Sequence, residues 1–500
     1  MPDLVEIRPA VVARSLDRRL ESHGPSPHNR KASRMPVHGS VEQIFRRLKE
    51  LPSLYAVLAL TVGTFLVFAQ PPGQGLDEIR HFYRVWTFTG GAFVDAHGRA
   101  GGPIPQCLSV YMNHFASAAS GRAPFSLSQY WQSPQACTTK PIFGAYGTAV
   151  YNAPIAYLPE IIAVGILRAV GAPIPLIFFA GRLATLLAFV GIFYVAIRLI
   201  PVGKQVLFVL GLFPTTLLLA STYSADPMPI ALAVLAVSIT LRCRHRDVPD
   251  RRSFPILFLV LAALTLTKPT MFIFAPLLFM VPVPGFSRTR PRPVLVQATA
   301  VVVVAALAGV WSLVTRRVKI GNVYGLNPDK QIHFILHDPF GYGWVLARTF
   351  FESMGEARWL PGFIFSIGFP RPFVPDNIYA PVGLVVVGAL TLWYAYQLQF
   401  GAKQRIDHGA LTLAWLPVVL TVAGIILVET TLFVYGTPLG QPVTAAEGRY
   451  FYPFVALPLL TIDCFRRERQ VLRSTRWIVA GSVIMLTWLV IKIFVHDYNV

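Results

Sequence analysis

A series of long apolar runs constrains this 500-residue chain more than any other feature. A transmembrane helix needs roughly 20 predominantly apolar residues. The runs approach that length, some falling short of it, and they predict an all-α integral membrane protein with about eleven transmembrane helices. The expected spans are residues 52–69, 174–199, 204–223, 226–241, 254–267, 269–283, 294–315, 379–398, 410–430, 449–462 and 476–496.

The charge content agrees with this class. Charged residues make up 14% of the chain, whereas soluble domains carry about a quarter. In so apolar a chain, the net charge of +20 indicates Lys and Arg in loops on one side of a membrane, and no nucleic-acid partner is expected. Residues 1–50, with ten Lys and Arg, are predicted to be a disordered basic cytoplasmic tail. Residues 51–496 form the predicted polytopic membrane domain, and no cleavable signal peptide is visible.

The basic clusters predict the orientation of the spans. We expect residues 151–171, which contain two prolines, to lie flat at the outer interface, and residues 254–283 to divide into two spans at Lys268–Pro269. The N-terminal tail then shares the cytoplasmic side with four basic clusters, as the positive-inside rule requires. These clusters are "RHRDVPDRR", "SRTRPRP", "AKQR" and "FRRERQVLRSTR". The protein is therefore expected in the inner (plasma) membrane, with two larger outer loops at 70–173 and 316–378.

The four cysteines divide between the two sides of the membrane. Cys107 and Cys137 are expected in the first outer loop, while Cys243 and Cys464 are expected at cytoplasmic helix ends. A disulfide between Cys107 and Cys137 is plausible in an oxidising compartment, and two free thiols are the alternative. The cysteine and histidine spacings do not suggest a metal site.

Acidic residues directly outside two spans are the first functional candidates, because ionisable groups at the membrane surface often serve function. Asp77, Glu78 and His81 follow the first span, and Asp226 lies at the outer junction of two later spans. The structural alternative is that these carboxylates are favoured only as helix starts. Asp before Pro, as at position 226, is a common helix cap.

Basic and aromatic residues expected on the same outer side complete the candidate site. An Arg outside the membrane opposes the usual charge bias, so it suggests an anionic ligand such as a lipid phosphate. A Lys at the interface has the simpler explanation of reaching out of the apolar layer. The residues concerned are Lys268, Arg316, Arg317, Glu447, Arg449 and Tyr450.

Four motifs, in this order, resemble a bacterial family of polytopic membrane proteins of uncharacterised function. They are "LDEIRH" (76–81), "YSAD" (223–226), "TKP" (267–269) and "EGRYFYP" (447–453), and the likeness covers about residues 52–465. That family is in turn similar to the GT-C glycosyltransferases, such as protein O-mannosyltransferases and aminoarabinose transferases. The resemblance implies an essential acidic residue in the first outer loop, a second Asp in the next outer turn, and a polyprenyl-phosphate sugar donor. The long second outer loop matches no named GT-C subfamily, which leaves the acceptor open.

We therefore expect a membrane glycosyltransferase that moves a sugar from a polyprenyl-phosphate donor to a cell-envelope glycan, lipid or protein on the outer face, with inversion. Asp77 or Glu78 would act as general base, and Asp226 would position the acceptor or orient the base. Arg449, Arg316, Arg317 or Lys268 would hold the phosphate. The scheme requires no metal or other cofactor; a divalent ion held by Asp77 and Asp226 is the alternative. The alternatives are a lipid-linked oligosaccharide flippase or transporter, or a structural membrane protein.

Overall fold

The computed structural model describes most of the chain after the N-terminal tail. The described residues are 50–92, 98–117, 127–132, 138–245, 250–283, 292–318, 327–355, 363–364, 382–398, 408–443, 447–464 and 475–498. The chain divides into two units, Met1–Arg47 and Leu48–Val500. The first unit lies outside the described residues. The prediction of a disordered tail falls on the same part of the chain and stays a prediction. The helices, the strands and the pocket all belong to the second unit.

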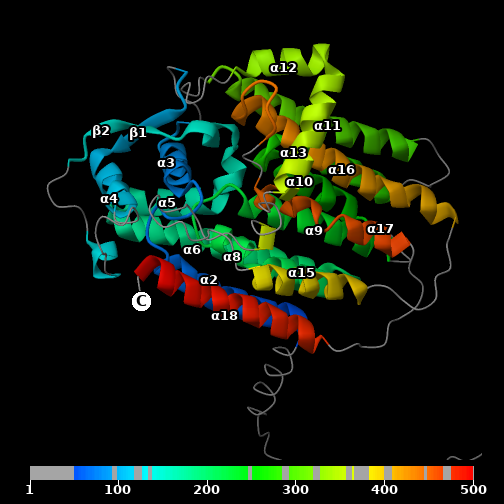
Figure 1. The fold of residues 1–500 in the computed structure, drawn as a ribbon, viewed down its shortest axis with the longest axis horizontal. Coiled ribbons are helices and arrows are strands. Elements are labelled where there is room, and N and C mark those ends of the chain that lie inside the picture. The colour runs from blue at the N-terminus through cyan, green and yellow to red at the C-terminus, as the bar shows by residue number, and fades with distance from the viewer. Residues whose placement is uncertain are drawn as a thin grey trace, which may run out of the picture. The chain divides into compact units, whose positions relative to one another are not determined.

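Helices dominate the described residues, and six of them are long and apolar enough to cross a membrane. These six are α2 (Leu51–Ala69), α6 (Ile174–Leu199), α9 (Pro227–Arg244), α11 (Arg292–Thr315), α16 (His408–Gly436) and α18 (Arg476–Tyr498). They coincide closely with six of the predicted spans. In Figure 1, α2 and α18 lie side by side, with α6 next to α2. The prediction of a predominantly helical, multi-pass membrane protein is confirmed.

Prolines interrupt most of the remaining apolar runs, because proline lacks the backbone N–H that an α-helix needs. Residues 204–223 form two buried helices, the second of which begins at Pro214. The segment 254–283 is divided into two helices at Lys268–Pro269, as predicted. Residues 449–462 begin as a 3₁₀ turn containing Pro453. The elements are α7 (Lys204–Leu212), α8 (Pro214–Ala220), α10 (Ser253–Thr267), η5 (Pro269–Met280), α15 (Val382–Gln397), η6 (Gly448–Phe454) and α17 (Pro458–Cys464).

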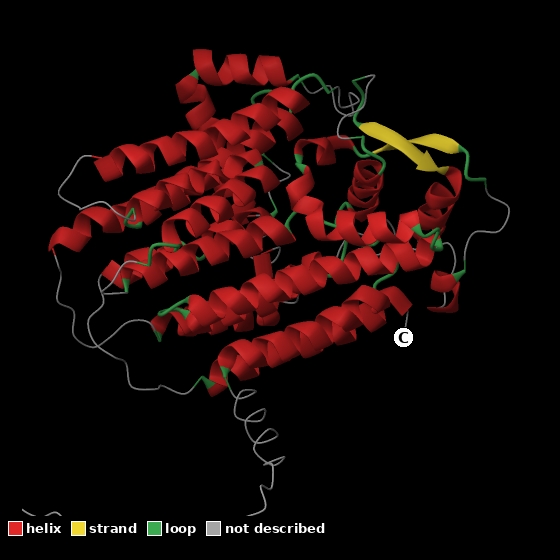
Figure 2. Cartoon of the chain, turned by 180° about the vertical axis from the view of Figure 1, so that it is seen from behind, coloured by secondary structure: helices red, strands yellow, loops and turns green. Residues whose placement is uncertain are grey.

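The segment between α2 and α6 forms a separate layer of short elements at one end of the long helices (Figure 1). The elements are α3 (Glu78–Thr89), β1 (Gly101–Pro105), α4 (Gln106–Ser117), η2 (Leu127–Trp131), β2 (Pro141–Ala145), η3 (Gly147–Tyr151), η4 (Pro154–Tyr157) and α5 (Leu158–Ala169). Strands β1 and β2 pair antiparallel, with Gly101 opposite Ala145 and Pro105 opposite Pro141. Figure 2 shows this two-stranded sheet, which the sequence did not predict, from behind.

The segment after α11 contributes two further helices, α12 (Pro328–His337) and α13 (Pro339–Gly355). Asn327 caps α12 by accepting a hydrogen bond from the backbone N–H of Lys330 at 3.1 Å. Tyr342 and Val345 of α13 pack with Phe433 of α16 in a small cluster beside the main core. The main core extends through the long helices and the layer between α2 and α6.

Candidate functional site

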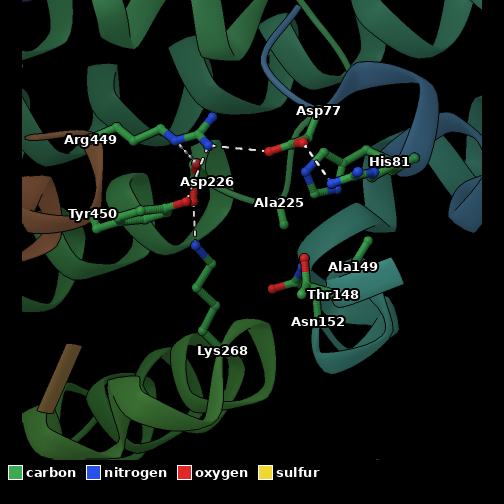
Figure 3. A pocket seen from close by; sticks show the side chains of 11 residues that line it. Asp77, His81, Thr148, Ala149, Asn152, Ala225, Asp226, Lys268, Arg449 and Tyr450 are labelled. Carbon is green, nitrogen blue, oxygen red and sulfur yellow. Dashed lines mark hydrogen bonds and ion pairs between the residues drawn. The ribbon is translucent and has the colours of Figure 1, made fainter. Parts of the chain in front are cut away.

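A partly open pocket gathers residues from five separate parts of the chain. It encloses an empty volume of about 410 Å³, part of which is open solvent. Figure 3 shows the pocket from close by. Its lining residues are Asp77, Arg80, His81, Thr148, Ala149, Asn152, Ala225, Asp226, Lys268, Arg449 and Tyr450. Six of the residues singled out in the sequence therefore meet here: Asp77, His81, Asp226, Lys268, Arg449 and Tyr450.

Asp77 stands at the start of α3 but does not cap it. Its backbone adopts the left-handed conformation, with φ of 56°, and its side chain makes no capping hydrogen bond. Asp and Asn tolerate this conformation better than most residues. The carboxylate instead lies 3.2 Å from Nη1 of Arg80 and 3.4 Å from Nη2 of Arg449. The side chain is about 30% exposed, so it can reach a bound molecule.

Asp226 repeats this arrangement at the start of α9. Its side chain also makes no capping hydrogen bond. One carboxylate oxygen forms an ion pair with Nζ of Lys268, and the other lies 3.7 Å from Nε of Arg449. Burial raises the pKa of Asp226, but Lys268 and Arg449 outweigh that effect and lower it below the ordinary value. Asp226 is therefore held as a carboxylate between two cations.

Arg449 is the central cation of the pocket. It is 4% exposed, and the 3₁₀ turn η6 presents its guanidinium to Asp77, Asp226 and Glu447. Nε lies 3.1 Å from the Glu447 carboxylate, and Nη2 donates to the Tyr450 hydroxyl at 3.2 Å. Nε nevertheless makes no hydrogen bond of good geometry. The guanidinium thus lies within 3.1 to 3.7 Å of three carboxylates at once.

Glu78 turns away from the pocket into a buried ion pair. Both Glu78 and Arg182 have fully buried side chains, joined by two hydrogen bonds of 2.8 and 2.7 Å. Arg182 also donates to the backbone oxygens of Val67, Gln70 and Pro71. Glu78 accepts from the backbone N–H groups of residues 73, 75 and 223. A pair satisfied in this way ties the end of α2, the start of α3, α6 and the turn before Asp226 together.

Several predicted site residues lie elsewhere. Glu78 does not line the pocket because it is committed to Arg182. Arg316 and Arg317 are exposed at the end of α11 and do not line it either. Cys107 is disulfide-bonded. Cys137 lies outside the described residues, so its pairing with Cys107 stays a prediction.

Sequence reasoning missed three polar lining residues, Arg80, Thr148 and Asn152. Thr148 lies in η3 and Asn152 directly follows it. Only the packing of η3 against α3 brings them to the pocket, so the sequence carries no signal for them. The sequence did contain a signal for the buried Arg182, because an arginine inside an apolar run is costly unless it has a partner.

The chemistry available to this pocket is acid–base and electrostatic. Three cationic and two anionic side chains line it, with the Glu447 carboxylate at its edge. Desolvation raises the pKa of Glu447, and Arg449 opposes that rise. Within the described residues, no three His, Cys, Asp or Glu side chains are grouped to hold a metal ion. The pocket can hold an anion on Arg449 and Lys268 and accept a proton on Asp77.

The fold and the pocket together define a multi-pass membrane protein with an ionic site at the ends of its helices. The chain belongs to the family described as predicted membrane protein DUF2142, whose model matches residues 60–458. That match includes all the lining residues of the pocket. No curated protein and no solved structure matches the chain.

Proposed function

We propose that this protein is a glycosyltransferase with a GT-C-like fold and about eleven spans, whose N-terminus is cytoplasmic in the inner membrane. It transfers a sugar from a polyprenyl-phosphate donor to a cell-envelope acceptor on the outer face. The observation that carries the proposal is the pairing of Asp77 and Arg449, 3.4 Å apart, in one partly open pocket. A base and an anion-binding group beside each other are what transfer from a phosphate requires.

The phosphate of the donor binds Arg449 and Lys268 in this scheme. A guanidinium about 4 Å from a phosphate contributes about 4 kcal/mol at an intermediate dielectric. The position of both cations in the lining of one pocket supports this role. A phosphate on Arg449 also competes with Asp77 for the guanidinium. Donor binding therefore weakens the ion pair between Arg449 and Asp77 and leaves that carboxylate available to the acceptor hydroxyl.

The reaction is a single displacement. The acceptor hydroxyl oxygen attacks the anomeric carbon, and its proton passes to the Asp77 carboxylate. The bond between that carbon and the phosphate oxygen breaks, and the lipid phosphate leaves with the bonding electrons. Attack opposite the leaving group inverts the anomeric configuration. Asp226, held by Lys268, positions the acceptor or keeps Arg449 in place.

A transporter would carry its ionisable residues near the membrane midplane on broken helices. Here the pocket charges lie at the starts of α3 and α9, at the α10–η5 junction and in η6. This distribution favours chemistry at the surface over transport.

The test is transfer by the purified protein in nanodiscs. Radiolabelled undecaprenyl-phosphate hexoses and pentoses are supplied as donors, with envelope membranes from a deletion strain as acceptor. We expect label to enter the acceptor and free undecaprenyl phosphate to appear in equal amounts. The Asp329→Asn variant, which changes an exposed carboxylate of α12, is a matched control with full activity. Movement of intact donor across the bilayer without transfer would instead identify a flippase.

A further inference from the structure

We infer that the wall of the pocket opposite Arg449, made by His81, Thr148 and Asn152, binds the hydroxyl groups of the transferred sugar. This inference rests on the proposed function and assigns the sugar and the phosphate to different sides of one pocket. In Figure 3, Arg449 and Tyr450 lie on the left and Asp226 lies beside them, nearer the centre. His81, Thr148 and Asn152 lie farther to the right, together with Asp77.

Three neutral hydrogen-bonding side chains lie on the right-hand side, next to the Asp77 carboxylate. Thr148 belongs to η3, Asn152 directly follows η3, and His81 belongs to α3. A hydroxyl and a carboxamide both donate and accept, which matches the hydroxyl groups of a sugar ring. A phosphate instead prefers the guanidinium and ammonium groups opposite. The two walls therefore suit the two parts of a sugar phosphate.

These groups have capacity left for a ligand. Among the described residues, the Thr148 hydroxyl has no hydrogen-bond partner, and Asn152 uses one donor only, toward the Tyr157 hydroxyl at 3.3 Å. Thr148 is exposed and Asn152 is half-buried. Both side chains line the pocket.

Tyr157 holds both His81 and Asn152 in place. Its hydroxyl accepts from Nδ2 of Asn152 at 3.3 Å and lies 2.6 Å from Nδ1 of His81. Desolvation lowers the pKa of His81 to about 4, so the ring is neutral at pH 7. His81 therefore adds an uncharged hydrogen-bonding ring to this side of the pocket.

The experiment compares two lipids, undecaprenyl phosphate with and without the sugar that the wild-type protein transfers. Their dissociation constants are measured on protein in nanodiscs for the wild type, Thr148→Val and Asn152→Ala. Both substitutions remove hydrogen-bonding groups, and Thr148→Val also keeps the side-chain shape. The controls Thr138→Val and Asn113→Ala change exposed side chains outside the pocket.

We expect the wild type to prefer the sugar-bearing lipid, and each pocket variant to reduce that preference roughly 3- to 10-fold, the value of one net hydrogen bond. Affinity for undecaprenyl phosphate itself stays unchanged in these variants. Arg449→Lys, by contrast, weakens the binding of both lipids by the same factor. An unchanged preference in both pocket variants overturns the sugar subsite while the proposed function stands. Failure of the wild type to bind either lipid overturns the function as well.

Discussion

Asp77 and Asp226 both directly precede a helix, where a carboxylate ordinarily accepts hydrogen bonds from the first backbone N–H groups. Neither side chain does so here. Each carboxylate instead contacts Arg449 and one further cation. The sequence left the cap and the functional interpretation equally open at Asp77. The side-chain geometry removes the cap interpretation, because a cap would have used the helix N–H groups.

We predict that replacing Arg449 by lysine impairs sugar transfer even though the positive charge is kept. Lysine keeps the charge but cannot offer the fork of donors that holds Asp77, Tyr450 and a phosphate together. Arg449→Lys should lower kcat/KM for the lipid donor by about 10- to 100-fold, the value of one charge-assisted hydrogen bond. Glu447→Gln should give a milder defect of the same kind. Steady-state kinetics with the radiolabelled donor provide the measurement.

Arg348→Lys is the control for this substitution, because Arg348 forms an exposed ion pair with Glu352 on α13. Its kinetics should equal those of the wild type. If Arg449→Lys also keeps wild-type kinetics, Arg449 is not a phosphate ligand, and the exposed Arg316 and Arg317 become the next residues to test.

At the scale of elements, the Glu78–Arg182 pair determines where the pocket residues lie. Glu78 follows Asp77 directly and accepts from the backbone of Tyr223, three residues before Asp226. Arg182 holds the last turn of α2 and the loop beyond it. The two pocket aspartates are thus positioned by one buried ion pair that neither of them touches.

Breaking this pair should destabilise the protein strongly. Glu78→Gln leaves the Arg182 charge buried without its partner, a change that typically costs about 3–5 kcal/mol. We expect a clearly lower Tm in detergent and reduced accumulation in the membrane. Glu352→Gln, in an exposed pair, should change Tm little. Equal Tm values for Glu78→Gln and Glu352→Gln would contradict the positioning role.

Sequence patterns predicted the long apolar helices better than the short elements. Hydropathy is a property of the run itself, so α2, α6 and α11 were found within a few residues. The break at Lys268–Pro269 was also predicted, because proline ends helices locally. The pairing of β1 with β2, by contrast, joins segments that α4 and η2 separate in the chain. For the same reason Thr148 and Asn152 could not be assigned to the pocket from the sequence.

At the scale of the whole molecule, residues separated by up to 372 positions meet at one end of the helices. Arg244 at the end of α9 lies 3.4 Å from Asp463 at the end of α17. This contact joins the ends of two predicted spans that were both expected on the cytoplasmic side. The charge distribution and the contacts therefore agree on which helix ends belong together.

The orientation is tested by cysteine labelling in intact cells. Asp247→Cys, in a basic cluster outside the described residues, should resist a membrane-impermeant maleimide until the cells are opened. Asn113→Cys in α4 should react from outside. Native Cys243 and Cys464 are replaced by Ser in both strains. Labelling of position 247 in intact cells would reverse the proposed topology and move the pocket to the cytoplasmic face.

The most direct test of the central claim, that Asp77 in this pocket supports sugar transfer, is mass spectrometry of envelope glycans in a deletion strain. The strain is complemented with the wild type, Asp77→Asn or Asp329→Asn. Asn keeps the left-handed backbone and the shape of Asp77 but cannot accept the proton, so transfer should fall about 10²–10⁴-fold. We predict that one glycan lacks a sugar in the deletion strain, and that the wild type and Asp329→Asn restore it while Asp77→Asn does not. Full restoration by an Asp77→Asn protein that accumulates normally would contradict the account.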